Sequence, residues 1–124
     1  MSEFQAKFEA YGGDYAATMP RFLGSEEMYS RIFAMLFRDE NMTKLKDSLQ
    51  AGDLHAAFEA AHTLKGVAGN LGLTPFYNAV CKIVEPLRSG EKRQDYQQLY
   101  QEILTEFQKV EQLRQELSPD DENA

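Results

Sequence analysis

The chain has 124 residues, of which 43% are hydrophobic and 27% charged, so its length and composition suit one globular domain with an ordinary core. Its 13 basic and 20 acidic residues give a net charge of -7, which argues against nucleic-acid binding and against electrostatic attachment to anionic lipid. The sequence contains neither an apolar run long enough to span a membrane nor a signal-peptide pattern at its start, and we expect a cytoplasmic protein.

Polar residues and glycines divide the chain into helical segments. Two short segments, residues 2–11 and 14–22, make up an expected N-terminal helical extension over residues 1–24. A long helix is then predicted from Ser25, which is a good N-cap, to Gly52, which favours a helix end. Its apolar residues recur at intervals of three, four and seven positions, as on the buried stripe of a helix. This stripe consists of Met28, Ile32, Met35, Leu36, Met42, Leu45 and Leu49.

Three more helical segments follow, over residues 53–71, 74–89 and 93–117, each with an apolar stripe of the same period. Asp53 is the expected cap of the first segment. Thr74 is the expected cap of the second, because the proline that follows it suits the first helical position.

The order of these elements predicts an all-α fold. Four long amphipathic segments with short connections favour an up-down-up-down antiparallel four-helix bundle over residues 25–117, with one or two short N-terminal helices laid across it. Pro86 is expected to bend or end the third bundle helix, because proline removes a backbone hydrogen bond and crowds the preceding turn. Residues 118–124 are expected to form a frayed acidic tail.

The segment over residues 53–71 carries His62 at its centre. At about 100° per residue, Ala60, Leu64 and Leu71 lie within roughly 20° of the direction opposite His62. The core stripe therefore lies opposite the imidazole, which should point into solvent. Several side chains and two glycines share the exposed side with His62, within roughly 60° of it. They are His55, Phe58, Glu59, Lys65, Gly66 and Gly69.

This exposed face favours phosphoryl chemistry. Gly66 and Gly69 each cost about 0.5–1 kcal/mol relative to alanine inside a helix, which suits a face that another molecule must approach closely. A neutral imidazole can bond covalently to phosphorus through a ring nitrogen. Lys65 lies one turn from His62 and can offset the new negative charge, and Gly66 leaves room for the phosphoryl oxygens. Because the sequence has no glycine-rich nucleotide-binding loop, we expect a phosphate carrier without kinase or phosphatase activity of its own.

The stretch Ala61–Gly72, with the sequence AHTLKGVAGNLG, closely resembles the signature of histidine phosphotransfer (HPt) domains, and the similarity extends over nearly the whole predicted bundle. The resemblance implies a phosphorelay module in which His62 is phosphorylated, Lys65 stabilises the phosphate and Gly66 is the small residue beside the ring. The partners it implies are receiver domains of response regulators or hybrid histidine kinases. The resemblance also implies that magnesium belongs to the receiver and that this chain binds no cofactor.

In some HPt domains a polar side chain on the following helix holds the imidazole. This sequence has Val84 near that place, which leaves Asn78, Lys82, Glu85 or water to orient the ring.

We expect His55, Phe58, Glu59 and Gly69 to form the docking surface for the partner around His62. Each has an alternative role. Phe58 can be covered by the N-terminal segment, and Gly69 can allow close helix packing. His55 and Glu59 can be ordinary solvated residues. The chain is expected to be a monomer.

Two other functions stay open at this point. His55, Glu59 and His62 occur at i, i+4 and i+7 and could share a metal ion, although bundle metal sites draw inward-pointing ligands from several helices. The other possibility is a helical interaction bundle whose histidine has no chemical role.

Overall fold

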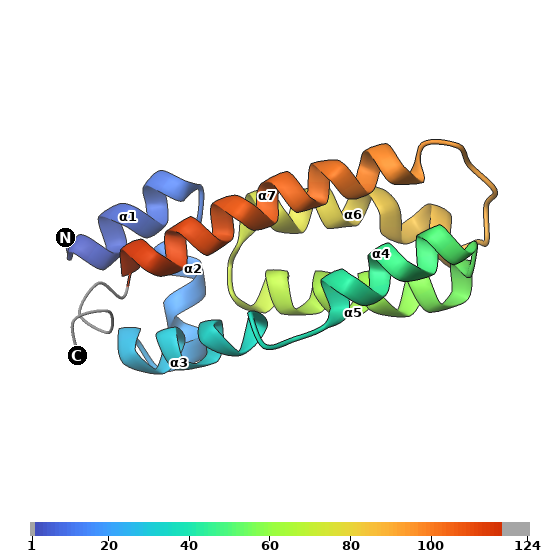
Figure 1. Ribbon diagram of the computed structural model, residues 1–124. Helices are drawn as coiled ribbons and strands as arrows, with labels where there is room; N and C mark the ends of the chain where they lie inside the picture. The colour runs from blue at the N-terminus through green and yellow to red at the C-terminus, as the bar shows by residue number, and fades with distance from the viewer. Residues whose placement is uncertain (1, 118–124) are drawn as a thin grey trace.

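The computed structural model describes residues 2–117, and in this part of the chain it contains helices joined by loops and no strand (Figure 1). The all-α fold predicted from the sequence is therefore confirmed. In chain order the elements are α1 (Glu3–Tyr11), α2 (Tyr15–Thr18), the 3-10 helix η1 (Met19–Phe22), α3 (Glu26–Leu36), α4 (Asn41–Ala51), α5 (Leu54–Asn70), α6 (Thr74–Arg88) and α7 (Tyr96–Leu117).

Helices α4, α5, α6 and α7 form the bundle. Each packs against the next along the chain, and α7 closes the ring against α4. Figure 1 shows α6 and α7 running together along one side of the molecule and α4 and α5 along the other. The short connections make neighbouring helices antiparallel, which gives the predicted up-down-up-down arrangement.

The first long helix is interrupted, so the single helix predicted over residues 25–52 is wrong. Helix α3 ends at Leu36, and α4 begins at Asn41. The backbone N–H groups of residues 37–39 donate to carbonyls three positions earlier, which is the tighter 3-10 pattern. The Asp39 carboxylate then accepts the Asn41 backbone N–H at 2.7 Å. This side chain offers the backbone a local partner in place of a continuing helix.

The buried face of α3 also differs from the prediction. Tyr29, Phe33 and Leu36 are buried, whereas Ile32 and Met35 are 37% and 60% exposed. Both faces of this helix are apolar, so periodicity alone does not separate them. The aromatic face is buried because it offers more apolar area and meets other aromatic rings.

Tyr29 connects the N-terminal helices to the bundle. Its ring centroid lies 5.6 Å from that of Phe8 and 5.0 Å from that of Phe22, both in edge-on geometry. Its hydroxyl donates a hydrogen bond of 2.6 Å to the carbonyl of Leu71, just after α5. Helix α1 packs against the C-terminal part of α7 (Figure 1). The N-terminal segment is therefore part of the packed structure.

Helix α5 has well-defined ends. The Asp53 carboxylate accepts the Ala56 backbone N–H at 3.0 Å and caps the helix as predicted. After α5, Gly72 has a φ of +68°, and a Cβ there would lie 2.0 Å from the Thr18 hydroxyl. Only glycine suits this position, because it needs a left-handed backbone and because Thr18 fills the space.

The ends of α6 and α7 differ slightly from the prediction. Thr74 is the first residue of α6, and Leu73 stands at the cap position without a side-chain hydrogen bond. Helix α6 continues past Pro86 and ends at Arg88. Helix α7 begins at Tyr96, a few residues later than predicted.

The tail predicted over residues 118–124 lies outside the described residues. Within residues 2–117, no helix is both long enough and apolar enough to cross a membrane.

Candidate functional site

Helix α5 places His62 at its centre, on the solvent-exposed side. The exposure predicted for the imidazole is therefore confirmed. Its position follows from the alanine-rich stripe on the opposite face, which lets α5 sit deep between its neighbours. The buried residues of α5 are Ala57, Ala60, Ala61, Leu64 and Ala68.

An open depression of about 390 Å³ lies beside His62. The C-terminal half of α5 forms its floor, and η1 and α6 contribute one side chain each. Its lining residues are Arg21, His62, Lys65, Gly66, Gly69, Asn70 and Tyr77. The structure thus brings together four of the residues singled out in the sequence, namely His62, Lys65, Gly66 and Gly69.

Lys65 supplies a positive charge to this depression. Its side chain is half-buried, and among residues 2–117 no carboxylate lies at ion-pair distance from its ammonium group. Lys82 on α6, in contrast, pairs with Glu102 at 3.6 Å. The Lys65 ammonium is therefore available to an anion bound beside His62.

The two glycines of the site have different surroundings. A Cβ at Gly66 would meet no atom of residues 2–117 within 4 Å, so the missing side chain leaves open space one turn after His62. A Cβ at Gly69 would lie 3.3 Å from the ring of Tyr77. Gly69 thus allows Tyr77 of α6 to pack closely against α5, which is the packing alternative considered for this residue.

Arg21 was not identified as a site residue from the sequence. Its Nη1 donates to the carbonyls of Gly69 and Asn70 at 2.9 and 3.1 Å. The last carbonyls of a helix lack intrahelical partners, and a cation is favoured at this end of the helix dipole. Arg21 therefore satisfies the end of α5 while lining the depression. No local signal could have identified this contact, because it joins distant parts of the chain.

The imidazole of His62 stacks on the ring of Phe58, one turn earlier on α5. The two ring centroids are 5.4 Å apart, and the ring planes differ by 21°. The guanidinium of Arg88 lies over the Phe58 ring, with its Cζ 4.9 Å from the centroid. Phe58 is half-buried and is covered here by Arg88 from α6.

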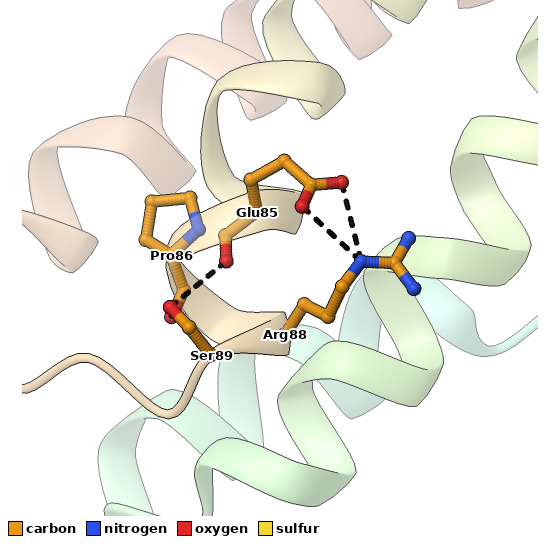
Figure 2. A network of polar contacts seen from close by, with 4 residues as sticks. All are labelled: Glu85, Pro86, Arg88 and Ser89. Atoms are coloured by element: carbon orange, nitrogen blue, oxygen red, sulfur yellow. Dashed lines mark hydrogen bonds and ion pairs between the residues drawn. The ribbon is translucent and has the colours of Figure 1, made fainter.

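The charged side chains considered for orienting the imidazole have other partners. Both carboxylate oxygens of Glu85 accept from Nε of Arg88 at 3.2 Å (Figure 2). Lys82 pairs with Glu102, and Val84 is fully buried in the core. Within residues 2–117, the ring of Phe58 is a direct neighbour of the imidazole and is the best candidate to orient it.

The remaining predicted docking residues lie away from the depression. His55 and Glu59 are exposed, and their Nε2 and Oε1 atoms are 3.4 Å apart. Glu59 borders a separate hollow between α4 and α5. Within residues 2–117, no group of three or more histidine, cysteine, aspartate or glutamate side chains is placed to hold a metal ion. His55, Glu59 and His62 therefore do not form the metal site considered from their spacing.

The comparison with known protein families identifies a family for most of the chain. Residues 36–118 match the family described as the Hpt domain, which covers more than half of the chain and includes all of α5. Neither a curated protein nor a solved structure matches the chain.

Proposed function

Because the chain belongs to the Hpt domain family, a family of histidine phosphotransfer modules, we propose that His62 carries the phosphoryl group in a two-component phosphorelay. His62 accepts the group from the aspartate of one receiver domain and passes it to the aspartate of another. The receivers belong to response regulators or hybrid histidine kinases.

One observation carries this proposal. The imidazole of His62 is exposed at the middle of α5, with Lys65 and the open space at Gly66 beside it. An attacking nitrogen needs access, a nearby cation can stabilise the phosphoryl oxygens, and those oxygens need room. This face of α5 supplies all three.

The transfer step follows from these parts. The lone pair of one imidazole nitrogen attacks the phosphorus of the aspartyl phosphate, and an N–P bond forms. The P–O bond to the aspartate breaks, and its electron pair stays on the carboxylate oxygen. The other ring nitrogen keeps its proton, so the ring becomes an imidazolium that bears the phosphoryl group. The reverse sequence delivers the group to the next receiver.

We propose that this chain acts as a carrier and not as an autonomous kinase or phosphatase. Lys65 is the cation that it brings to the reaction, and magnesium is expected on the receiver. We further propose that the chain works as a monomer in the cytoplasm, with Gly69, Phe58, His55 and Glu59 around the docking surface. Of these four residues, Gly69 borders the same depression as His62.

The proposal predicts that His62→Gln abolishes phosphorylation while the fold stays intact. The chain is mixed with a receiver domain carrying labelled aspartyl phosphate, and acid-labile, base-stable label on the chain is measured. His55→Gln is the control for the second of the chain's 2 histidines, which lies on the same helix, and it should still take up label. Slower labelling of His55→Gln would reflect its place on the proposed docking surface. Label on the His62→Gln variant, or no label at any time on His55→Gln, would contradict the assignment. Equal receiver affinity of the wild-type chain and His62→Gln, with no label on either, would favour the interaction-only function.

Lys65→Ala is expected to slow the transfer about tenfold, because the half-buried Lys65 ammonium is partly screened by solvent and stabilises the phosphoryl charge less than a fully buried cation would. The rate constant is measured at saturating receiver. Lys46→Ala removes an exposed lysine from α4 and should leave the rate unchanged. Equal rates for both variants would remove the role proposed for Lys65.

A further inference from the structure

Arg88 and His62 both contact the ring of Phe58 on the outer side of the α5–α6 pair. The Arg88 guanidinium covers one part of the Phe58 ring at 4.9 Å, and the imidazole stacks on the same ring at 5.4 Å. We propose that Phe58 and Arg88 are positioning residues that set the plane of the His62 ring for phosphoryl transfer. This inference rests on the function proposed above.

The plane of the ring matters because the attacking lone pair lies in it. An exposed imidazole on a helix can otherwise rotate about its side-chain bonds, and only some orientations aim the nitrogen at an incoming phosphorus. The near-parallel stack, with 21° between the ring planes, restricts this rotation. Phe58 precedes His62 by one turn, and Gly66 follows it by one turn. The imidazole thus has an aromatic wall on one side and open space on the other.

Arg88 in turn holds Phe58. A cation over an aromatic ring is attracted to it, and Phe58 is half-buried, so the ring has few other positions. The Glu85 carboxylate favours this position of the exposed guanidinium through two contacts of 3.2 Å to its Nε (Figure 2). The Ser89 hydroxyl donates to the carbonyls of Glu85 and Pro86, both at 3.3 Å, and so closes the last turn of α6. The end of α6 thus presents Arg88 to the Phe58 ring.

The test compares Phe58→Leu with Phe58→Tyr. Leucine keeps an apolar side chain but removes the ring, whereas tyrosine keeps the ring. Two quantities are measured: the NMR shifts of the His62 ring protons, which a stacked ring displaces, and the transfer rate constant at saturating receiver. Phe58→Leu should abolish the ring-induced shift and lower the rate constant at saturating receiver about three- to tenfold, whatever its effect on the receiver Kd. Phe58→Tyr should keep both values. Arg88→Gln should reduce both the ring-induced shift of the His62 protons and the transfer rate constant.

A matched control exists elsewhere in the chain. The Arg114 guanidinium lies 5.0 Å from the ring centroid of Phe37, so Phe37→Leu breaks a similar pair away from His62. This variant should change neither the His62 shifts nor the rate constant.

The outcomes separate this inference from the function on which it rests. If Phe58→Leu transfers at the wild-type rate, or slows only through a weaker receiver Kd, the positioning role is overturned and the proposed function stands. If the wild-type chain takes up no label from any phosphorylated receiver, the proposed function falls and the positioning role with it. Unperturbed His62 shifts in the wild-type chain would overturn the stack itself.

Discussion

At the scale of single residues, Gly66 is expected to lower the stability of α5 while it favours the proposed transfer at His62. Its position inside α5 has ordinary helical backbone, and a side chain there would enter open space. Glycine therefore lowers helix stability without relieving any steric conflict in this chain. The same open space lies beside His62, where the proposed phosphoryl group needs room.

Gly66→Ala should raise the free energy of unfolding by about 0.5–1 kcal/mol, because alanine loses less backbone entropy in a helix. The same substitution should slow transfer to His62, because its methyl group occupies space beside the ring. Urea unfolding and the transfer rate constant measure the two effects.

Gly69→Ala is the comparison, because its Cβ would press on the Tyr77 ring at 3.3 Å. Its gain in stability should be smaller. Faster or unchanged transfer in Gly66→Ala would contradict the role given to the gap.

The sequence was sufficient to predict that His62, Lys65 and Gly66 lie together on one face of α5, but not what surrounds them. His62, Lys65 and Gly66 share one helix, so the helical period fixes their relative positions. Arg21 and Tyr77 come from other elements, and periodicity cannot place them. Arg88 lies between these cases. Arg88 and Phe58 are equally far along the chain from Leu73, so the antiparallel pair of α5 and α6 places them side by side. This contact could be predicted from the sequence if α5 and α6 are assumed to form a helical hairpin.

At the scale of elements, α5 is held at both ends by side chains. Asp53 caps its start, and Arg21 binds the carbonyls at its end. The capping signal is local and was predicted. The break between α3 and α4 was not, because the residues at 37–40 are compatible with a continuous helix, and the side chain of Asp39 decides against it.

Asp53→Ala should lower the free energy of unfolding by about 1 kcal/mol, because the Ala56 N–H loses its acceptor. Asp53→Asn keeps an acceptor oxygen and should cost no more than a few tenths of that amount. Chemical denaturation checks both values. Transfer to His62, measured where both variants are fully folded, should stay at the wild-type rate. Equal stability of Asp53→Ala and Asp53→Asn would contradict the capping role.

At the scale of the whole molecule, buried tyrosines make the fold sensitive to alkaline pH. Burial raises the pKa of Tyr29 well above its usual value, and burial does the same to the pKa of Tyr11. Below about pH 10 both phenols are neutral in the folded and the unfolded chain, so they give no pH dependence. Above that pH the unfolded chain loses these protons first, and the folded state loses stability as the pH rises.

Tyr29→Phe should therefore have two effects. At pH 7 it should lower the free energy of unfolding by about 0.5–1.5 kcal/mol, because the hydrogen bond to the Leu71 carbonyl is lost. Between about pH 10 and pH 11 it should lose less additional stability than the wild-type chain, because one titrating phenol is gone. Denaturant midpoints of both proteins at the two pH values measure the difference. Parallel losses in the two proteins would show that Tyr29 does not titrate on unfolding.

The choice of which face of α3 is buried also depends on the packing of the whole molecule. Whether Tyr29 or Ile32 faces inward depends on Phe8 and Phe22, which reach the helix from the N-terminal segment. A pattern within the helix contains no information about them. This is why the sequence predicted the all-α helical bundle but not the buried face of α3.

The contacts of Arg21 and Tyr29 with the end of α5 indicate how much of the chain a shortened fragment must keep. The match to the Hpt family starts at residue 36. Arg21 and Tyr29, whose side chains donate hydrogen bonds to the carbonyls of residues 69–71, both come before that residue. A fragment trimmed to the matched residues would leave these carbonyls bare and expose the hydrophobic surface beneath them. The residues matched by the family model therefore leave out side chains that hold the C-terminal end of α5 in place.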